Sequence, residues 1–446
     1  MARDKVYSAD IVIIGAGTAG SAAAVGAADQ GMRVLLIEQS GAAGGSGAAG
    51  LVTPMMTTRM PGNPSCSYVG EEINRRMTAL GAARAEGFQF DPAMLSFVLE
   101  AMLMERGVKL LLHTTLIDAR LENRRVAALE VFNKSGRARV EGRVFLDATG
   151  DADLLCLAGL PLTHGDEDTG KNQPVSLRYV VGGVDEAAFR AFLNERGEAQ
   201  TGEALYGAVT TAPGRVWPLS SVFEEAIAAG DLVPDDAVYW QFFGLPGRPD
   251  SIAFNCPEFF DLHDADDAEN LTYVQLQGKQ AILRQLLFYR KYLPGFQRAY
   301  VSAVASMVGV RESRRAVTDY VVTAEDLLAR RKFDDAIAQS NYPVDVHGRK
   351  LNHPENAAAP DSAPWFEVPL RALIVRDADN LLVAGRNLGA EFIAQSAIRI
   401  IPTCRAMGEA AAIAAARACR GEDLHRVDGS AVRGEMIRRG ARFAPC

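Results

Sequence analysis

The sequence contains no CxxC pair, and its six cysteines are scattered along the chain. Zinc sites and iron–sulfur clusters need closely spaced ligands, so no metal centre is predicted. Scattered cysteines are typical of a reducing compartment, and a first core strand at Asp10 leaves no room for a secretory signal peptide. We therefore expect a cytoplasmic protein. The six cysteines are Cys66, Cys156, Cys256, Cys404, Cys419 and Cys446.

Long basic runs and long apolar runs are also missing. The net charge is −8, and no cluster of Lys and Arg offers the basic face that nucleic acid requires. No uncharged apolar stretch reaches the about 18 residues that a membrane-spanning helix needs. Apolar residues still make up 48% of the chain, and its 446 residues exceed what one simple core accommodates. We expect a globular protein of two domains.

The best-defined pattern lies in the first fifty residues. Asp10–Ile14 is a short β-branched run that predicts a buried strand, and the glycine motif Gly15–Gly20 follows at once. A helix is expected over Ser21–Gln30, and a second strand over Met32–Ile37 ends in Glu38. Strand, GxGxxG, helix, strand and acid form the dinucleotide-binding pattern in its required context. An ordinary βαβ turn without a ligand is the alternative.

Each glycine of this motif has a physical role. Gly15 permits the tight turn, Gly17 lets the backbone approach a pyrophosphate, and Gly20 lets the helix lie close to the strand. The helix N-terminus offers free N–H groups to the phosphates, and the carboxylate that ends the second strand accepts hydrogen bonds from a ribose. The predicted cofactor contacts here are Gly15, Gly17, Thr18, Ala19, Gly20 and Glu38.

A second glycine-rich loop, residues 41–50, follows the ribose acid directly. A nicotinamide enzyme normally continues into another helix at this point. A loop with almost no side chains predicts that a flat or charged group lies against its backbone, and Gly44, Gly45 and Ser46 are the expected contacts. This favours FAD over NAD; a flexible linker is the alternative.

Three strands separated by short turns predict a β-meander over Leu116–Glu122, Arg125–Phe132 and Val140–Leu146. The last strand leads into an Ala-Thr-Gly turn, which we interpret as a second backbone approach to the cofactor. Its expected contacts are Thr149, Gly150 and Asp151.

The composition changes after residue 160, where aromatic residues become concentrated. Ser176–Val181 predicts a strand and Asn270–Tyr292 a long helix. We expect an α/β fold in which a Rossmann-like FAD-binding domain, with a parallel sheet and the three-stranded meander, carries an inserted mixed α+β substrate domain. The expected bounds are 1–160 and 372–446 for the first domain and 161–371 for the second.

Two candidates for chemistry lie late in the inserted segment. Arg311 follows an apolar stretch, whereas Arg314 and Arg315 could equally belong to a solvated charge run. His347 is expected at the end of a short strand, before Gly348, and is a candidate acid or base; a purely structural histidine is the alternative.

The last segment is expected to rejoin the first domain. Asn380–Arg386 predicts an apolar strand that ends beside the cofactor at Gly385 and Arg386. Residues 399–405 then open a long Ala-rich helix whose N-terminus, with Thr403, points back at the cofactor. A helix N-terminus stabilises the negative charge of a reduced flavin. A plain packing helix is the alternative.

Taken together, these segments resemble the FAD-dependent oxidoreductases of the glutathione-reductase-like superfamily, and in particular the group similar to fumarate reductase flavoproteins. The resemblance implies that FAD stretches between the first GxGxxG and the final helix, and that the backbone of Leu116 meets the adenine. The matching residues are Gly15–Gly20 with Glu38, Gly44-Gly45, Asp147–Asp153, Arg311–Arg314, Asp345–His347, Asn380–Arg386 and Arg399–Gly408.

The sequence also departs from this family. A Ser and, three residues later, a His often follow the Ala-Gly-Arg segment, and here Gly389 and Phe392 stand in their places. This puts an acid or base role at those positions in doubt. The glycine-rich loop holds no His, so the FAD is expected to be non-covalent.

The sequence therefore predicts a flavin-dependent dehydrogenase or reductase that exchanges hydride with a small organic substrate. Arg311 and Arg399 are candidates for binding a carboxylate or a polarised oxygen, and His347 for proton transfer. A flavin monooxygenase and a non-catalytic flavin-binding module are the alternatives. No second GxGxxG offers a site for NAD(P)H, so oxygen, a quinone or another redox protein is the candidate electron partner; the oligomeric state stays open.

Overall fold

The computed structural model describes residues 5–60, 62, 65–84, 89–200, 202, 205–208, 217–260, 264–347 and 365–445. Its centre is a sheet of seven described strands. Strand β1 (Lys5–Ile14) pairs in parallel with β2 (Val34–Ile37) on one side and β6 (Gly136–Asp147) on the other. Strands β3 (Lys109–Leu111) and β18 (Leu381–Val383) extend the sheet in parallel beyond β2 and β6. Residues from both ends of the chain thus share one sheet, as the sequence predicts.

The meander joins this sheet through its last strand. Strands β4 (Thr115–Glu122) and β5 (Arg125–Asn133) pair antiparallel with each other, and β5 pairs antiparallel with β6. Because β6 also pairs with β1, the predicted meander and the predicted parallel sheet are continuous. Together with the insertion described below, this confirms the predicted α/β fold class.

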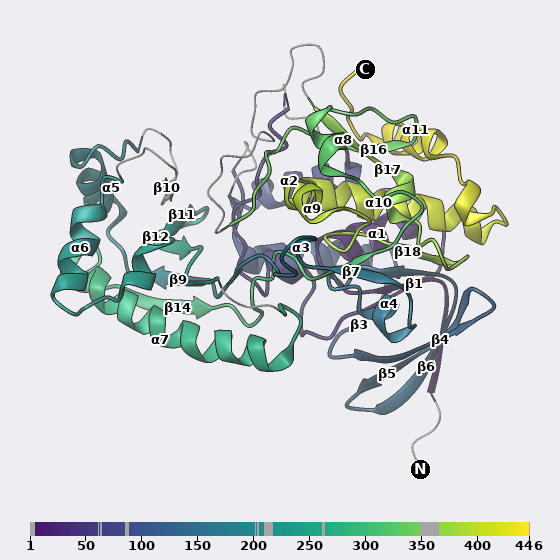
Figure 1. Cartoon of the computed structure of the whole chain (residues 1–446), viewed down its shortest axis with the longest axis horizontal. Coiled ribbons are helices and arrows are strands. Elements are labelled where there is room, and N and C mark those ends of the chain that lie inside the picture. Colours follow the sequence, from purple (N-terminus) through teal and green to yellow (C-terminus); the bar gives the residue numbers. More distant parts are fainter. Residues whose placement is uncertain are drawn as a thin grey trace.

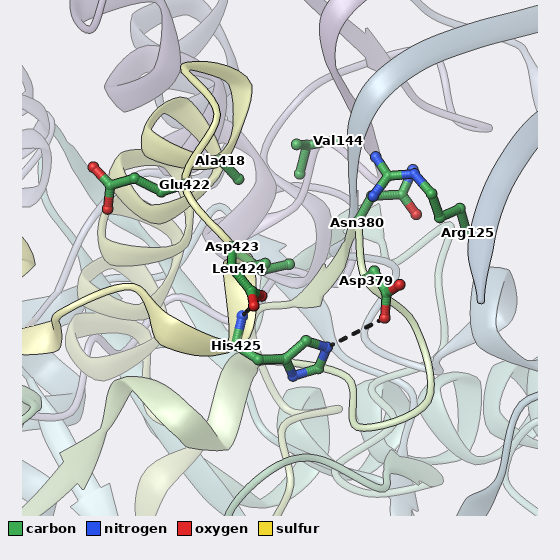
Figure 2. Close-up of a pocket in the computed structure, with 9 residues that line it drawn as sticks. All are labelled: Arg125, Val144, Asp379, Asn380, Ala418, Glu422, Asp423, Leu424 and His425. Atoms are coloured by element: carbon green, nitrogen blue, oxygen red, sulfur yellow. Dashed lines mark hydrogen bonds and ion pairs between the residues drawn. The ribbon is translucent and has the colours of Figure 1, made fainter. Parts of the chain in front are cut away.

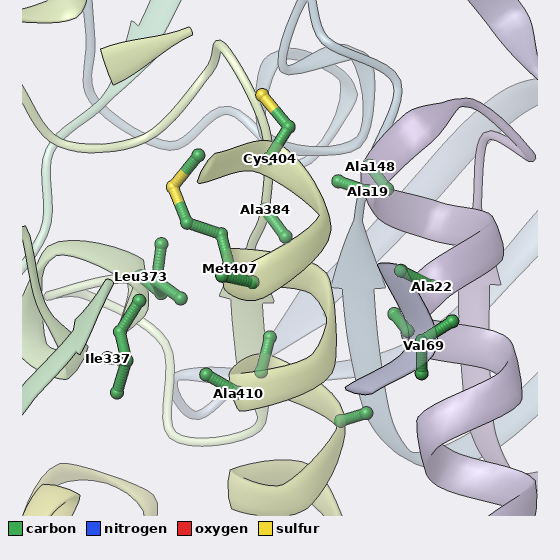
Figure 3. Packing of buried hydrophobic residues seen from close by; sticks show 14 of the residues in the cluster. Ala19, Ala22, Val69, Ala148, Ile337, Leu373, Ala384, Cys404, Met407 and Ala410 are labelled. Atoms are coloured by element: carbon green, nitrogen blue, oxygen red, sulfur yellow. The ribbon is translucent and has the colours of Figure 1, made fainter. Parts of the chain in front are cut away.

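Two helices rich in small residues pack against each other on this sheet (Figures 1 and 3). They are α1 (Thr18–Asp29) and α10 (Ile401–Cys419). Ala19 and Ala22 of α1 and Met407 and Ala410 of α10 are all buried in the same apolar cluster. Small side chains let the helix backbones approach closely, which brings the N-termini of both helices to the same region of the domain.

The inserted part has its own layers. Strands β10 (Tyr206–Ala208), β11 (Gln241–Leu245), β12 (Arg248–Phe254), β9 (Tyr179–Gly182) and β14 (Tyr300–Val304) form an antiparallel sheet in that order. Helices α5 (Glu186–Glu195), α6 (Ser220–Ala228) and α7 (Ala268–Tyr292) lie on the same side of the molecule as this sheet, away from α1 and α10 (Figure 1).

The buried apolar side chains fall into three large groups with different origins. The first surrounds α1 and α10, the second contains apolar residues between 175 and 310, and the third joins β1 to the meander and β18. Apolar residues between 322 and 370, which the sequence assigns to the insertion, pack in the first group. The domain bounds stay a prediction, and this packing favours a shorter insertion than 161–371.

None of the helices in the described parts of the chain is long and apolar enough to cross a membrane.

The remaining elements are short connections and peripheral helices. These elements are α2 (Tyr68–Ala79), α3 (Pro92–Glu105), α4 (Asp153–Leu157), β7 (Leu162–His164), β8 (Val175–Ser176), β13 (Glu258–Phe259), β15 (Arg314–Ala316), α8 (Ala324–Leu328), β16 (Ala336–Ser340), β17 (Phe366–Pro369), α9 (Phe392–Ile398) and α11 (Gly429–Arg439).

Candidate functional site

The glycine motif between β1 and α1 forms a closely packed turn with one open position. Gly15 has φ +94°, and a Cβ there would stand 2.5 Å from the carbonyl oxygen of Ala148. A Cβ on Gly20 would overlap the carbonyl oxygen of Gly15, so the helix lies against the strand as predicted. A Cβ on Gly17 would meet only the Cα of Gly45, at 3.9 Å. No other atom of the described residues lies within 4 Å of that position, so the space next to Gly17 is open.

The N-terminus of α1 faces this open position without a side-chain cap. Gly17 is the N-cap residue and provides no side-chain acceptor, and Thr18 and Ala19 follow in the first turn. Uncapped N–H groups at a helix N-terminus bind anions such as a pyrophosphate.

Glu38 holds the two glycine-rich loops in place. Its Oε2 accepts a hydrogen bond from the backbone N–H of Ala16 at 2.8 Å, and its Oε1 accepts one from Ser40 at 2.7 Å. A carboxylate offers about four acceptor positions, so capacity remains for a ribose hydroxyl. The backbone N–H of Thr114 donates to the carbonyl oxygen of Glu38, which places the start of β4, and with it Leu116, next to this end of the site.

The second glycine-rich loop lies directly over the first. The N–H of Gly44, whose φ is +115°, donates to the carbonyl oxygen of Ala16 at 2.8 Å. A Cβ on Gly45 would stand 2.7 Å from the Cα of Gly17, and Ser46 continues in the same short 3₁₀ turn. Side chains on these glycines would close the space beside the motif, which disfavours the linker interpretation.

The Ala-Thr-Gly turn after β6 is built around a buried carboxylate. Asp147 accepts hydrogen bonds from the N–H and the hydroxyl of Thr149 at 3.0 and 2.7 Å. Gly150 has φ +83° and packs under the guanidinium of Arg386, which forms a 2.7 Å ion pair with Asp151. Burial opposes ionisation of Asp151, but the Arg386 charge outweighs it and lowers the pKa of that carboxyl.

Unpartnered polar atoms lie in the first turn of α10 and beside Gly385, which faces Ala19 of α1. The hydroxyl of Thr403 and the Oδ1 of Asn387 are buried and have no hydrogen-bond partner among the described residues. Gly385 has φ +117°, and a Cβ on it would stand 3.7 Å from that Oδ1. Buried polar groups are normally paired, so these atoms indicate a polar ligand at this helix end.

These features fit a dinucleotide cofactor. The N-terminus of α1 is uncapped, and the position next to Gly17 is open. Buried polar atoms without partners among the described residues lie at Thr403 and Asn387. All of these features belong to the same domain. Every predicted cofactor residue belongs to one of these loops or helix ends, except Leu116, which lies at the start of β4. Their individual contacts with a cofactor stay predictions.

The three predicted catalytic residues meet in one charged cluster. The guanidinium of Arg311 pairs with Glu258, and the Nδ1 of His347 lies 2.9 Å from the same carboxylate. The Nε2 of His347 lies 3.5 Å from Asp345, whose side chain also pairs with Arg399 at 3.3 Å. Two carboxylates thus connect all three residues. Burial opposes ionisation of Glu258, but the charges of Arg311 and His347 lower its pKa.

Strands of the insertion and the end of α9 position this cluster. Strand β13, which carries Glu258, pairs antiparallel with β8, and Ser176 of β8 forms a bridge with Gly309, two residues before Arg311. Arg399 is the C-cap residue of α9, immediately before α10. The amide of Gln395 donates to the carbonyl oxygens of Arg311 and Arg386, which ties the cluster to the predicted cofactor edge.

One local prediction near this cluster is wrong, and one alternative left open for Arg315 is excluded. Residues 341–346, which precede His347, contain no strand, because pairing between β16 and β17 ends at Ser340; Gly348 lies outside the described residues. Arg315 is not part of a solvated charge run, because its side chain is only 1% exposed and pairs with Glu312 and Glu167.

Sequence reasoning missed three members of the cluster. Glu258 is a single acid near a Pro, with no motif around it. Tyr239, whose ring centre lies 5.1 Å from that of His347, belongs to an aromatic-rich segment without distinctive spacing. Arg178 is hidden because Ser176–Val181 was expected as one strand; the structure has two strands there, β8 and β9, in different sheets. A charged residue inside an apolar run was the available signal.

A surface pocket of about 310 Å³ lies elsewhere and holds none of the predicted site residues (Figure 2). His425 lies at its wall, with its Nδ1 2.7 Å from Asp319 and its Nε2 3.8 Å from Asp379. The pocket opens beside β5 and the end of α10, far along that helix from Thr403. It plays no part in the site described above.

Solved flavoenzyme structures resemble this chain at low sequence identity. The flavin-dependent brominase Bmp2 is 12% identical, with a TM-score of 0.49 over 97% of this chain and 84% of that one. A geranylgeranyl bacteriochlorophyll reductase-like protein from Thermoplasma acidophilum is 12% identical, with a TM-score of 0.48 over 98% and 85%. The p-nitrophenol 4-monooxygenase PnpA from Pseudomonas putida DLL-E4 is 12% identical, with a TM-score of 0.46 over 98% and 87%.

The sequence comparison is more specific. Among curated proteins, none matches the chain. The family described as FAD dependent oxidoreductase matches residues 10–436, which include β1, the glycine-rich loops, the charged cluster and α10. The chain belongs to this family of FAD-dependent oxidoreductases: it is an enzyme, and FAD is its cofactor.

Proposed function

We propose that the protein is a flavin dehydrogenase or reductase acting on a small organic substrate that bears a carboxylate. FAD supplies the chemistry of hydride exchange at N5. The observation that carries the proposal is the convergence of Arg311, His347 and Arg399 around Glu258 and Asp345, next to the N-terminus of α10.

The cluster has the groups that such a substrate requires. Arg311 and Arg399 present planar guanidinium groups, which bind carboxylates with fixed geometry. The Nδ1 of His347 lies 2.9 Å from Glu258, which holds the ring in one orientation. The Nε2, at the longer distance of 3.5 Å from Asp345, is the nitrogen that can exchange a proton with the substrate. The Nε of Arg399 is buried without a partner among the described residues and remains free to donate.

We also propose that the enzyme belongs to the group similar to fumarate reductase flavoproteins, on the residues quoted for that resemblance. The departures have a physical basis here. A Cβ on Gly389 would overlap the hydroxyl of Thr318, so a Ser does not fit at that position. Phe392 is buried at the start of α9, and its N–H donates to Glu167. The proton-transfer role therefore falls on His347 in the charged cluster.

Anaerobic reduction of the bound flavin tests the activity. The purified holoenzyme is mixed without oxygen with a panel of hydroxy, amino and unsaturated carboxylic acids, with matching neutral amides as controls, and flavin absorbance is followed. Bleaching by one or more carboxylates, or reoxidation of photoreduced flavin by an unsaturated one, supports the proposal. Substrate-dependent oxygen uptake with a hydroxylated product would instead establish a monooxygenase.

Arg399→Lys tests the site within that assay. Lysine keeps the charge but loses the planar fork that reaches Asp345 and Gln173. We expect flavin content to stay full and the rate of flavin reduction to fall about tenfold or more, the consequence of losing a hydrogen bond to a charged group. A lower melting temperature with an unchanged reduction rate would remove Arg399 from the site.

A further inference from the structure

Arg178 is a buried cation whose side chain has neither a counter-ion nor a hydrogen-bond partner in the described parts of the chain. It follows β8 and precedes β9, and its side chain is 8% exposed. Its backbone is fixed, because the N–H of Ala305 donates to its carbonyl oxygen at 2.9 Å. Its Nε is buried without a partner, and its guanidinium forms neither a hydrogen bond nor an ion pair with a described residue.

Arg178 lies beside the charged cluster, because a Cβ on Gly309, two residues before Arg311, would stand 3.9 Å from the Nε of Arg178. Burial and the charge of Arg311 lower the pKa of Arg178 to about 9, with a further contribution from Arg399. Among the described residues, the cluster contains three guanidinium groups and two carboxylates, Glu258 and Asp345. At least one buried positive charge therefore lacks a counter-charge from the described part of the chain, and a buried unpaired charge is costly.

The polar atoms left unpaired in the cluster are mainly donors. Arg399 and Arg178 each retain a buried Nε–H without an acceptor among the described residues. The Oε1 of Glu258 already faces Arg311 and His347, and the carboxylate of Asp345 faces Arg399 and His347. The Oε2 of Glu258 is a buried acceptor without a partner among the described residues, so two unpaired donors stand against one unpaired acceptor. An incoming group with acceptor oxygens and one negative charge would satisfy both the charge and the donors, which is the chemistry of a carboxylate.

We propose that Arg178 binds the carboxylate of the substrate and is the residue that selects charged substrates over neutral ones. This rests on the proposed function, since it assigns the substrate carboxylate to a residue outside Arg311, His347 and Arg399. The guanidinium donates to the carboxylate oxygens, while Glu258 and Asp345 keep the other two arginines paired.

Equilibrium binding to the oxidised holoenzyme tests this without turnover. Acetate, benzoate and succinate are the carboxylate probes, and acetamide and benzamide are the neutral controls, measured by calorimetry and by flavin difference spectra. The wild-type protein should bind at least one carboxylate more tightly than its amide. Arg178→Met should weaken that carboxylate about ten- to hundredfold, the range for a lost hydrogen bond between charged groups, and leave amide binding unchanged.

Matched variants separate this role from a structural one. Arg330 is also a buried arginine without an acidic partner among the described residues, and it lies outside the cluster. Arg330→Met should leave carboxylate binding unchanged. Arg178→Lys, which keeps the charge, should show an intermediate loss and serves if Arg178→Met does not fold.

Three outcomes would overturn the proposal. The first is that the wild-type protein binds none of the carboxylates. The second is that Arg178→Met, or Arg178→Lys in its place, binds them as tightly as the wild-type protein. The third is that substitution lowers the midpoint potential of the flavin without changing carboxylate affinity, which would assign the charge to reduced flavin. Arg178-dependent binding in a protein whose flavin is neither reduced nor reoxidised by any carboxylate would support the carboxylate site and contradict the proposed hydride chemistry.

Discussion

Glu409 shows how one buried residue in α10 can make the stability of the protein depend on pH. Its side chain is fully buried; Oε2 accepts hydrogen bonds from the hydroxyl of Ser67 and the N–H of Val69, and Oε1 has no partner among the described residues. Burial raises the pKa of Glu409 to about 8, although the hydrogen bond from Ser67 opposes this. The carboxyl is therefore neutral in the folded protein at neutral pH.

Glu409→Gln should remove that pH dependence. The pKa of Glu409 in the folded protein lies above the value near 4.3 in the unfolded chain. The contribution of Glu409 to the free energy of unfolding is therefore complete below pH 4.3 and is lost as the pH rises toward 8. Between pH 5 and pH 8, the free energy of unfolding of the variant should increase relative to that of the wild-type protein, by on the order of 1 kcal/mol per pH unit at most. Denaturant unfolding at several pH values measures the difference, and two parallel stability profiles would contradict it.

Gly17→Val should separate cofactor binding from folding. A Cβ on Gly17 would meet no atom of the described residues closer than the Cα of Gly45 at 3.9 Å, so a valine side chain would occupy the space predicted for the pyrophosphate with little change in the protein packing. We expect a folded protein that loses most of its FAD, measured by the ratio of flavin to protein absorbance. Gly434→Val, on α11 with open space around it, is the control and should retain FAD. A full complement of flavin in Gly17→Val would show that this loop is misassigned.

At the residue scale, the sequence was informative where backbone geometry restricts the residue type. Gly15 and Gly44 adopt positive φ values, and Gly20 has no room for a Cβ, so their spacing in the sequence predicts the loops. Arg178 and Glu258 carry no such constraint. Their roles come from contacts between segments far apart in the chain, and no local pattern encodes these.

At the element scale, the contact between α1 and α10 depends on a glycine. A Cβ on Gly408 of α10 would overlap the carbonyl oxygen of Ala19 in α1. Gly408→Ala should therefore push the helices apart and destabilise the protein by roughly 1–3 kcal/mol or more, as overpacking does, with partial loss of FAD. Thermal unfolding and flavin content measure both effects.

Gly434→Ala is the matched control for that substitution. Gly434 lies in α11, and a Cβ there would meet only the end of the Arg438 side chain, at 3.5 Å. The same chemical change should stabilise the protein by up to about 1 kcal/mol, because Ala favours helix over Gly. If both variants lose the same stability, the close helix contact is not the cause.

Elements with a strong local pattern were predicted well. The β1–α1–β2 unit and α7 have clear periodicity or motif residues, and the structure places them within a few residues of the predicted bounds. The expected strand Ser176–Val181 fails because its two halves pair with different partners, β8 with β13 and β9 with β12 and β14. The periodicity of the sequence predicts an extended backbone, but it does not predict that the two halves pair with different strands. This change of pairing strand occurs at Arg178 and places that residue in the site.

At the scale of the whole molecule, the buried group around α1 and α10 and the buried group from residues 175–310 should respond differently to FAD. All predicted FAD contacts lie outside residues 175–310, whereas Trp217 and Trp240 belong to the group of buried side chains from that segment. A ligand that binds only the folded first domain stabilises it by mass action, about 3–4 kcal/mol at 100 to 1,000 times its dissociation constant. The residues around Trp217 and Trp240 are stabilised by FAD only through their contacts with the first domain.

The Trp365→Phe variant allows the unfolding of residues 175–310 to be followed separately by fluorescence, because it leaves Trp217 and Trp240 as the only tryptophans. We compare holoenzyme and FAD-stripped protein of this variant by calorimetry and by tryptophan fluorescence on heating. Removing FAD should lower the calorimetric transition of the first domain by roughly 5–10 °C and move the tryptophan transition less. Equal shifts in both signals would show that the charged cluster, with Glu258 paired to Arg311 and His347, couples the two parts into one unfolding unit.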